Sequence, residues 1–352
     1  MRCRLLAAFG LVAALLATAP TADAQEKTSF RIAWSIYVGW MPWGYAADAG
    51  IVDKWAEKYG IEIEVVQIND YIESINQYTA GAFDGCVMTN MDALTIPAVG
   101  GVDSTALIIG DFSNGNDGIV SKTAKDVAGL ANSEVYLVEL SVSHYLLARA
   151  LEEAALSERD LTVVNMSDAD LVGAFTSSDD IGHVVTWNPL LAEVAAYPDA
   201  SKLFDSSQIP GEIIDMMVVN TEVLDANPDF GKALTGAWYE TMALMAGDDE
   251  AAIAARTAMA EASGTDLAGY DAQLASTQMF FDPAEAVAFT ESPDLVTTMD
   301  SVRQFSDRHG LLEGGVDYVG IGFPDGSTLG DEGNIKLRFS PAFMAMAAEG
   351  AL

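Results

Sequence analysis

The sequence is poor in cysteine, and this scarcity limits how the protein can be stabilised. Its 352 residues contain two cysteines, Cys3 and Cys86. Cys3 lies in an N-terminal segment that we expect to be removed, so the mature chain would keep one cysteine and could form no internal disulfide. Stability must then come from a large hydrophobic core, and the chain is long enough to build two domains.

Positive charge is also scarce. Lys and Arg number 17 against 52 Asp and Glu, which gives a net charge of −35 at pH 7. A surface of this sign repels nucleic acid and anionic lipid, so we expect no nucleic-acid partner.

Histidine and the common catalytic motifs are equally rare. His144, His183 and His309 lie in different segments, with no second histidine four residues away and no cysteine partner. The sequence therefore predicts no metal site. It also contains no G-x-S-x-G motif, and its glycine-rich stretches are typical of turns rather than of phosphate loops.

Long hydrophobic runs are limited to one, residues 5–17, which follows Arg2 and Arg4 and is too short to span a bilayer comfortably. The small-residue sequence "TADA" comes next and ends at Ala24. A basic start, a short apolar core and an A-x-A site predict a secretory signal peptide over residues 1–24, with a retained N-terminal anchor as the alternative. We expect an exported protein that is not embedded in the membrane after cleavage.

Strand-like and helix-like segments alternate along the rest of the chain. The helix-like segments begin at Pro42, Tyr71 and Ser141, and the pattern is mostly helical from Pro228 onward. The strand-like segments are residues 29–35, 61–68, 84–89, 104–111, 134–140, 161–166, 182–187 and 211–220. This alternation predicts an α/β fold with parallel-rich sheets flanked by helices, whose ligands bind at the carboxyl ends of the strands.

The segments that follow the predicted strands have an unusual composition. Five of the twelve residues 34–45 are aromatic, against 9% in the whole chain. None of the strand-end segments contains Lys or Arg, although together they carry seven carboxylates: Asp70, Asp92, Asp111, Asp117, Glu139, Glu212 and Asp215. Aromatic faces and carboxylates without basic partners are suited to a small cationic ligand.

Several segments resemble a known family. "NQYTAGAFDG" (76–85), "ELSVSHYLLARALEEAAL" (139–156) and "VVTWNP" (184–189) are similar to the periplasmic substrate-binding proteins of ABC importers for nitrate, sulfonates, taurine and thiamine precursors. Residues 88–120, 204–215 and 335–350 resemble more closely the subfamily encoded beside urea carboxylase. The resemblance covers essentially the whole mature chain.

The resemblance implies a two-lobed, type II periplasmic binding protein fold with the ligand cleft between the lobes. Lobe one would comprise residues 25–113 and 211–352, and lobe two residues 114–210. It also implies a periplasmic location, an ABC importer permease as partner, no cofactor, and a nitrogen-rich ligand, either urea or guanidinium. The turn-like sequences "DFSNGND" and "DSSQIPG" have the composition of the hinges that such a fold needs at its two crossings.

The composition of the strand-end segments favours guanidinium, because this planar cation has edge donors that match carboxylates and faces that stack on aromatics. Urea is the first alternative, and a sulfonate, nitrate or thiamine-precursor ligand the second. Thiamine pyrimidine synthases share the fold, but they use a cysteine-rich metal motif that this chain lacks, so we expect a binding protein and not an enzyme.

The candidate ligand-binding residues all lie in the strand-end segments: Trp34, Tyr37, Trp40, Asp92, Asp111, Glu139, Ser141, Trp187 and Glu212. Each has a purely structural alternative. The indoles can pack in the core, and Asp92 and Ser141 can cap helices. Asp111 can bond its own turn. Glu212 and Asp215 are three residues apart, so at most one of them should face the ligand from a regular strand.

Overall fold

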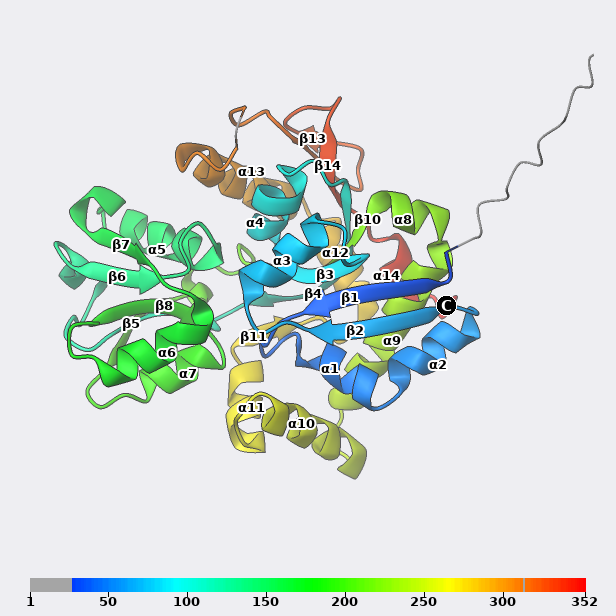
Figure 1. Ribbon diagram of the computed structural model, residues 1–352, viewed down its shortest axis with the longest axis horizontal. Helices are drawn as coiled ribbons and strands as arrows, with labels where there is room; N and C mark the ends of the chain where they lie inside the picture. The colour runs from blue at the N-terminus through cyan, green and yellow to red at the C-terminus, as the bar shows by residue number, and fades with distance from the viewer. Residues whose placement is uncertain (1–26, 313) are drawn as a thin grey trace, which may run out of the picture.

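The computed structural model describes residues 27–312 and 314–352, so the expected signal peptide lies outside the described residues. Two β-sheets, each flanked by helices, lie side by side along the long axis of the molecule (Figure 1). We call the part around the nine-stranded sheet the first lobe and the part around the five-stranded sheet the second lobe. No helix in the described ranges combines the length and the apolar character needed to cross a membrane.

The sheet of the first lobe mixes parallel and antiparallel pairs. Its strand order is β13-β12-β14-β4-β10-β3-β1-β2, with β11 paired to β4. β1 is parallel to both β2 and β3, whereas β10 runs antiparallel to β3 and β4. The strands are β1 (Ser29–Trp34), β2 (Glu62–Gln67), β3 (Gly85–Thr89), β4 (Ser104–Ser113), β10 (Ile214–Asn220), β11 (Thr277–Met279), β12 (Gly320–Gly322), β13 (Thr328–Leu329) and β14 (Ile335–Phe339).

The sheet of the second lobe has the order β7-β6-β8-β5-β9. β6 is parallel to β7 and β8, and β5 is antiparallel to β8 and β9. The strands are β5 (Asp117–Ser121), β6 (Glu134–Leu137), β7 (Thr162–Asn165), β8 (His183–Trp187) and β9 (Ser201–Asp205).

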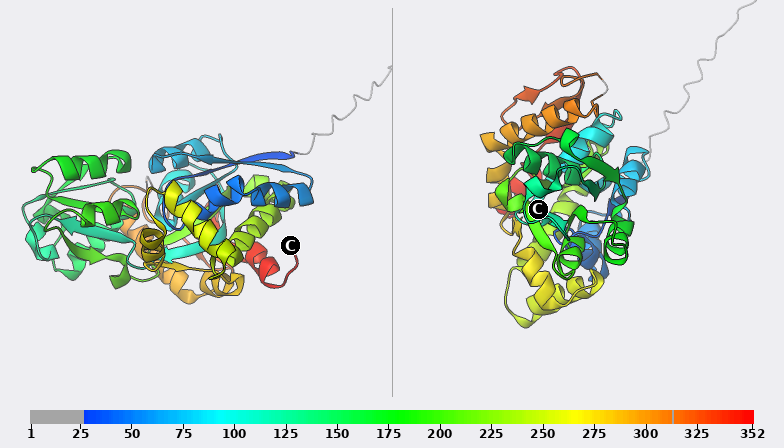
Figure 2. Two further views of the ribbon diagram at one scale, coloured as in Figure 1. Left: turned by 90° about the horizontal axis from the view of Figure 1, so that it is seen from below. Right: turned by 90° about the vertical axis from the view of Figure 1, so that its left-hand side faces the viewer.

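Helices cover the faces of both sheets (Figures 1 and 2). Those of the second lobe are α5 (Val142–Glu153), α6 (Asp168–Ser177) and α7 (Leu190–Ala195). The others are α1 (Met41–Asp48), α2 (Ile51–Lys58), α3 (Tyr71–Thr79), α4 (Asn90–Ala93), α8 (Thr221–Ala226), α9 (Pro228–Met245), α10 (Glu250–Ala262), α11 (Leu267–Leu274), α12 (Pro283–Thr290), α13 (Pro293–Arg308) and α14 (Ala342–Ala348). Short helical turns complete the set: η1 (Leu94–Ala98), η2 (Val127–Leu130), η3 (Glu158–Asp160) and η4 (Ser206–Gln208).

Local sequence explains where several of these helices begin. Pro42 occupies the first turn of α1, where its missing N–H costs nothing. Asp70 caps α3 by accepting a hydrogen bond from the backbone N–H of Glu73, and Ser141 caps α5 through the N–H of Ser143. Asp70 follows the carboxyl end of β2, and Ser141 follows that of β6. The two caps therefore place the starts of α3 and α5 beside the space between the lobes.

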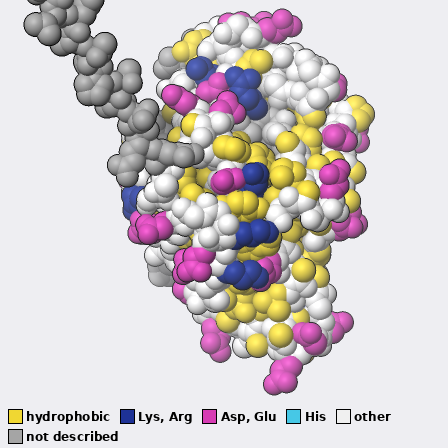
Figure 3. Space-filling model, turned by 90° about the vertical axis from the view of Figure 1, so that its right-hand side faces the viewer, with side chains coloured by type: hydrophobic (Ala, Val, Ile, Leu, Met, Phe, Trp, Pro, Cys, Tyr) yellow, Lys and Arg dark blue, Asp and Glu magenta, His cyan; other side chains and the backbone are white. Residues whose placement is uncertain are grey.

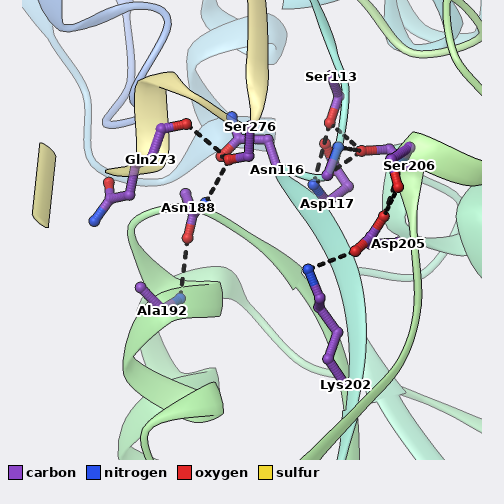
Figure 4. Close-up of polar contacts among 12 residues, drawn as sticks. Ser113, Asn116, Asp117, Asn188, Ala192, Lys202, Asp205, Ser206, Gln273 and Ser276 are labelled. Atoms are coloured by element: carbon purple, nitrogen blue, oxygen red, sulfur yellow. Dashed lines mark hydrogen bonds and ion pairs between the residues drawn. The ribbon is translucent and has the colours of Figure 1, made fainter. Parts of the chain in front are cut away.

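The chain passes between the lobes at two places that lie close together. The first crossing follows Ser113 at the end of β4, and the second runs through Ser206 after β9. The hydroxyls of these two serines are 2.6 Å apart, and Ser206 Oγ also accepts hydrogen bonds from the N–H groups of Gly115 and Asp117 (Figure 4). The assignment of residues 25–113 and 211–352 to lobe one and of residues 114–210 to lobe two, with each lobe moving as a unit, stays a prediction.

The core supplies the stability that disulfides cannot. Phe30 stacks on Phe230 with ring centroids 4.4 Å apart, and Trp43 stacks on Trp238 at 5.1 Å, so both pairs tie the first strand and helix to α9. Cys86, in the middle of β3, is fully buried, and burial raises the pKa of its thiol to about 12. The single described cysteine is therefore packed as a small hydrophobic residue.

Candidate functional site

A small cavity lies between the two lobes. The first lobe lines it with Tyr37, Trp40, Tyr71, Thr89, Ile213 and Asp215, and the second lobe with Asp117, Val142 and Trp187. The space inside it that a water-sized sphere can occupy is about 10 Å³, which is room for about one water molecule. A solute of several non-hydrogen atoms therefore enters only when the lobes or the lining side chains part. The cavity brings together the ends of β1, β3 and β8, as expected for this type of sheet.

Four aromatic side chains form a continuous wall of the cavity. The ring centroids of Tyr37 and Trp40 are 4.9 Å apart, those of Trp40 and Tyr71 are 5.5 Å apart, and those of Tyr71 and Trp187 are 5.7 Å apart. All four residues are buried. Since Trp187 comes from the second lobe and the other three from the first, this wall is complete only when the lobes are together.

Asp117 and Asp215 are the carboxylates that line the cavity, and both are buried. Burial raises the pKa of Asp117 to about 7, although the Ser113 hydroxyl opposes the shift. Burial, together with the charges of Asp111 and Asp117, raises the pKa of Asp215 well above its usual range. Neither carboxylate has a basic partner, so each would gain from a bound cation.

Each tyrosine of the wall donates its hydroxyl to an aspartate behind it. Tyr37 is 3.1 Å from Asp111 Oδ1, and Asp111 sits opposite Asp215 in the β4–β10 register. Tyr71 is 2.7 Å from Asp92 Oδ2, which also accepts a hydrogen bond from the Thr89 hydroxyl at 2.8 Å. Burial raises the pKa of Asp92 to about 6 and raises that of Asp111 as well.

Several buried polar atoms around the cavity have no hydrogen-bond partner. They include one oxygen each of Asp92, Asp111 and Asp215, and the indole Nε1 of Trp40. Because an unpaired buried polar group costs free energy, these atoms mark the side of the molecule where a ligand would restore hydrogen bonds. Of these residues only Asp215 and Trp40 line the cavity, and Asp215 lies close enough to Asp111 to share a proton with it.

Basic side chains are placed elsewhere and mostly in ion pairs. No described Lys or Arg lines the cavity. On the end of the first lobe that faces away from the second, Lys and Arg side chains lie beside acidic ones (Figure 3). Ion pairs of this kind include those of Lys54 with Glu240 and of Lys232 with Asp229. The electrostatic character of the cavity is therefore set by its carboxylates.

The structure gathers five of the nine predicted ligand residues at the cavity. Tyr37, Trp40 and Trp187 line it, and Asp92 and Asp111 stand directly behind the tyrosines.

The other four lie apart. Trp34 covers Gly44, where an added Cβ would come within 2.5 Å of the indole ring. The Glu139 side chain is exposed, and Ser141 caps α5. Glu212 accepts hydrogen bonds from Arg149 Nε at 2.9 Å and from the Tyr145 hydroxyl at 2.6 Å, so its charge is already compensated.

Sequence reasoning missed Tyr71, Thr89, Asp117, Val142, Ile213 and Asp215 as lining residues. Two of them carried a usable pattern. Asp117 and Asp215 stood among the seven strand-end carboxylates. The spacing argument for Glu212 and Asp215 assumed one regular strand, but β10 begins at Ile214 and leaves Glu212 outside it. Tyr71 comes directly after the capping residue Asp70, so the sequence marks Tyr71 as the start of a helix and does not indicate that it contacts the cavity.

The serines at the two crossings, Ser113 and Ser206, contact the site through Asp117. The backbone N–H of Asp117 lies 3.1 Å from Ser113 Oγ and 3.4 Å from Ser206 Oγ (Figure 4). On the other side of this crossing, Ser276 bonds Asn116 and Asn188 at 3.4 Å each. A cavity carboxylate is thus attached directly to the point where the chain passes between the lobes.

No protein-family model matches this sequence, and no curated protein matches it. Solved structures match its fold. The alkanesulfonate-binding protein SsuA from Xanthomonas axonopodis pv. citri, bound to MOPS, has a TM-score of 0.66 and 17% identity, over 82% of this chain and 96% of that one.

Two further structures agree. The periplasmic aliphatic sulphonate binding protein SsuA from Escherichia coli has a TM-score of 0.67 and 17% identity, over 82% of this chain and 95% of that one. The periplasmic nitrate-binding protein NrtA from Synechocystis PCC 6803 has a TM-score of 0.58 and 12% identity, over 93% and 99%. The predicted two-lobed, type II periplasmic binding protein fold is confirmed, and at these identities the likeness concerns the fold alone.

Proposed function

We propose that this protein is the periplasmic solute-binding component of an ABC importer, and that it binds guanidinium in the cavity between its lobes. The fold that it shares with sulfonate- and nitrate-binding proteins supports the first part. The expected signal peptide is consistent with the location. An ABC importer permease would be the partner that receives the solute, and the protein itself would perform no chemistry.

One observation carries the choice of ligand: two buried carboxylates, Asp117 and Asp215, line a cavity that no described Lys or Arg reaches. Guanidinium has the head-group chemistry of arginine, with N–H donors around its edge, a delocalised positive charge and no acceptor. Charge-assisted hydrogen bonds from such a cation are about twice as strong as neutral ones. Its flat faces suit the wall formed by Tyr37, Trp40, Tyr71 and Trp187.

The same carboxylates argue against the ligands named for the structural neighbours. A sulfonate or nitrate would enter a cavity lined by Asp117 and Asp215 with no described basic side chain to balance its charge. Repulsion in a buried site is strong, because the charges are not screened by water. So small a cavity also favours a four-atom solute over a long alkanesulfonate, because the smaller solute requires less opening of the lobes.

Urea is the second candidate, and a specific observation favours it. The indole N–H of Trp40 is buried without a partner. Urea carries a carbonyl oxygen that could accept from it, whereas guanidinium has no acceptor. The raised pKa values of Asp117 and Asp215 also allow protonated, uncharged carboxyls, which would tolerate a neutral ligand.

Isothermal titration calorimetry of the mature chain with guanidinium, urea, taurine and nitrate tests the proposal. We expect the tightest binding with guanidinium, weaker binding with urea, and no detectable binding of the two anions. If urea binds more tightly than guanidinium, then urea is the ligand of this site. Binding of taurine or nitrate without guanidinium would overturn the cation site altogether.

Trp40→Phe separates the two candidates further. The substitution keeps an aromatic face in the wall but removes the indole N–H, so it should weaken urea binding by ~0.5–1.5 kcal/mol if Trp40 donates to the urea oxygen. Guanidinium binding should change much less. An equal loss for both solutes would mean that the substitution disturbs the wall rather than one hydrogen bond.

A further inference from the structure

A second cluster of titratable groups joins the lobes away from the cavity. His144 belongs to α5 and Glu158 to η3, both in the second lobe, while His309 directly follows α13 in the first lobe. Both imidazole Nε2 atoms bond the Glu158 carboxylate, one on each oxygen, and the His309 contact is 2.5 Å long. Two histidines that are far apart in the sequence are thus linked through one carboxylate.

The hydrogen-bond partners of the ring nitrogens assign the protons. His309 Nδ1 lies 2.9 Å from the carbonyl oxygen of Phe305, which can only accept, and its Nε2 faces a carboxylate. Both nitrogens therefore carry hydrogens, and His309 is an imidazolium. His144 Nδ1 instead accepts from the backbone N–H of Leu140 at 3.1 Å, so its proton is on Nε2 and is donated to Glu158.

The same assignment argues against a metal ion, although the three ligand atoms lie within 4.8 Å of one another. A metal-bound histidine coordinates through one nitrogen and donates a hydrogen bond from the other. The other nitrogen of His144 faces an N–H donor, so Nε2 has no free lone pair for an ion. The cluster is built to hold a proton rather than a divalent cation.

We propose that the Glu158–His309 ion pair is a proton-dependent clamp that holds the two lobes together. It joins an acid of the second lobe to a base of the first, beside the ion pair of Arg149 with Glu212, whose arginine stays charged at all physiological pH values. His144 acts as a positioning residue for the Glu158 carboxylate. Aromatic packing of Phe305 on Tyr145 at 5.2 Å and on His144 at 5.8 Å continues the α5–α13 contact beside it.

Charged groups around His309 determine how the clamp responds to pH. Glu158 and His144 face it from the second lobe, and Arg308 faces it from its own helix. The hydrogen bond to Glu158 raises the pKa of His309, while Arg308 opposes the shift. Burial alone would raise the pKa of Glu158, but its bonds to both histidines lower it to about 2.

The sign follows from these directions. A histidine whose pKa is raised in the closed form stabilises that form fully below its ordinary value of about 6.5. This stabilisation is lost as the pH rises through the raised value. Since α5 begins at Val142, which lines the cavity, release of the clamp removes one of the contacts that hold this helix at the solute site. The inference holds whichever solute the protein binds.

Two measurements on the ligand-free mature chain test the clamp. Proton NMR follows the three histidine ring signals against pH, with His309→Gln identifying the His309 signal. We expect a His309 pKa above about 6.5 that returns toward this value in Glu158→Gln. Small-angle X-ray scattering should give a smaller radius of gyration at about pH 5.5 than at about pH 8.5, on either side of the histidine range.

His309→Gln serves as the matched comparison, because it keeps the cavity carboxylates and any pH response that they cause. The difference between wild type and this variant isolates the clamp and should appear as a loss of compaction at the lower pH. An identical pH response in both proteins would overturn the proposal. If the protein is compact at the higher pH only with added Zn²⁺, and a chelator reverses this, then a metal ion and not a proton holds the lobes together, and the proposal is wrong.

Discussion

At the level of single residues, Asp117 and Asp215 differ from the other carboxylates of this acidic chain in where they lie and in what they lack. Both are buried against the cavity, and neither has a basic partner. Glu212 shows the contrast, since it is also a strand-end carboxylate but is held by Arg149 and Tyr145. The presence or absence of a neighbouring basic side chain, and not the residue type, therefore separates a candidate ligand-binding carboxylate from a structural one.

Asp117→Asn and Asp215→Asn should each weaken guanidinium binding by ~2–5 kcal/mol, because each removes a charge that would pair with the buried cation. The amide keeps the size of the side chain, so the change tests charge and not packing. Calorimetry measures the effect. Glu57→Gln, on the exposed face of α2, is the matched control and should leave binding unchanged. A loss below tenfold in both aspartate variants would refute the cation site.

Guanidinium binding should also depend on pH. Asp117, with a raised pKa of about 7, must lose its proton before it can pair with a cation. Affinity should therefore fall about tenfold for each pH unit below that value, and it should go on rising above it as Asp215, whose pKa is also raised, loses its proton. Emission of Trp40 and Trp187, both in the cavity wall, provides the readout. Binding that strengthens toward acid pH would indicate a neutral or anionic ligand.

The composition of the sequence predicted an aromatic and acidic site, but it did not identify all of the residues that line the cavity. Tyr37, Trp40 and Trp187 could be found because aromatic residues cluster at predicted strand ends. Asp215 could not be chosen over Glu212, because the choice depends on Arg149, which lies sixty-three positions from Glu212 in sequence and reaches it only in the fold. The link from His144 to His309 through Glu158 was hidden for the same reason.

At the level of elements, the turn between β1 and α1 positions the first half of the aromatic wall. Gly39 lies in this turn, where an added Cβ would come within 2.5 Å of Asp111 Oδ2 and 2.6 Å of the Tyr37 ring. The backbone therefore approaches the Tyr37–Asp111 pair more closely than any residue with a side chain allows. Strand, turn and helix act together to hold one tyrosine in place.

Gly39→Ala should lower both the affinity for guanidinium and the melting temperature, at a cost of ~1–3 kcal/mol for overpacking. Gly173→Ala, in the exposed middle of α6 with no atom near its added Cβ, is the same substitution without the clash. It should stabilise the protein by ~0.5–1 kcal/mol and leave binding unchanged. Equal effects at the two positions would show that the turn does not support the site.

The predicted elements agree with the structure where the hydrophobic pattern is strong. The strand expected over residues 61–68 is β2, and the helix expected from Ser141 is α5. The sequence did not reveal the short strands β11–β14, which lie in the stretch read as mostly helical. β12 and β13 have three and two residues and pair with each other, and runs this short carry too few residues for an alternating hydrophobic pattern.

For the whole molecule, the buried carboxylates link stability to protons. Asp92 and Asp117 have pKa values of about 6 and about 7, raised chiefly by burial, against an ordinary value of about 3.9. The folded protein therefore binds protons more tightly than the unfolded chain. The contribution of these two carboxylates to the free energy of unfolding is present in full below about pH 4 and is lost as the pH rises from about 4 to about 7. The clamp at His309 acts in the same direction.

The ligand-free protein should accordingly melt at a higher temperature at about pH 5 than at about pH 8, and guanidinium at millimolar concentration should raise the melting temperature more at the higher pH. Differential scanning calorimetry measures both effects. Asp117→Asn should flatten the pH dependence, since it removes one of the titrating groups. A ligand-free protein that melts lower in acid would contradict this account.

Because Cys86 is buried, a single dye can be attached to the mature protein at a chosen position on its surface. A thiol that is fully buried and has a pKa of about 12 reacts hardly at all with maleimides, because the thiolate is the reactive form. A new cysteine placed in the surface groove between the lobes, for example at Glu139, which lines this groove together with Asp70, would be the site of labelling in the mature chain. An environment-sensitive dye at that position would turn lobe movement into an optical signal, and the protein would become a reagentless sensor for its own solute.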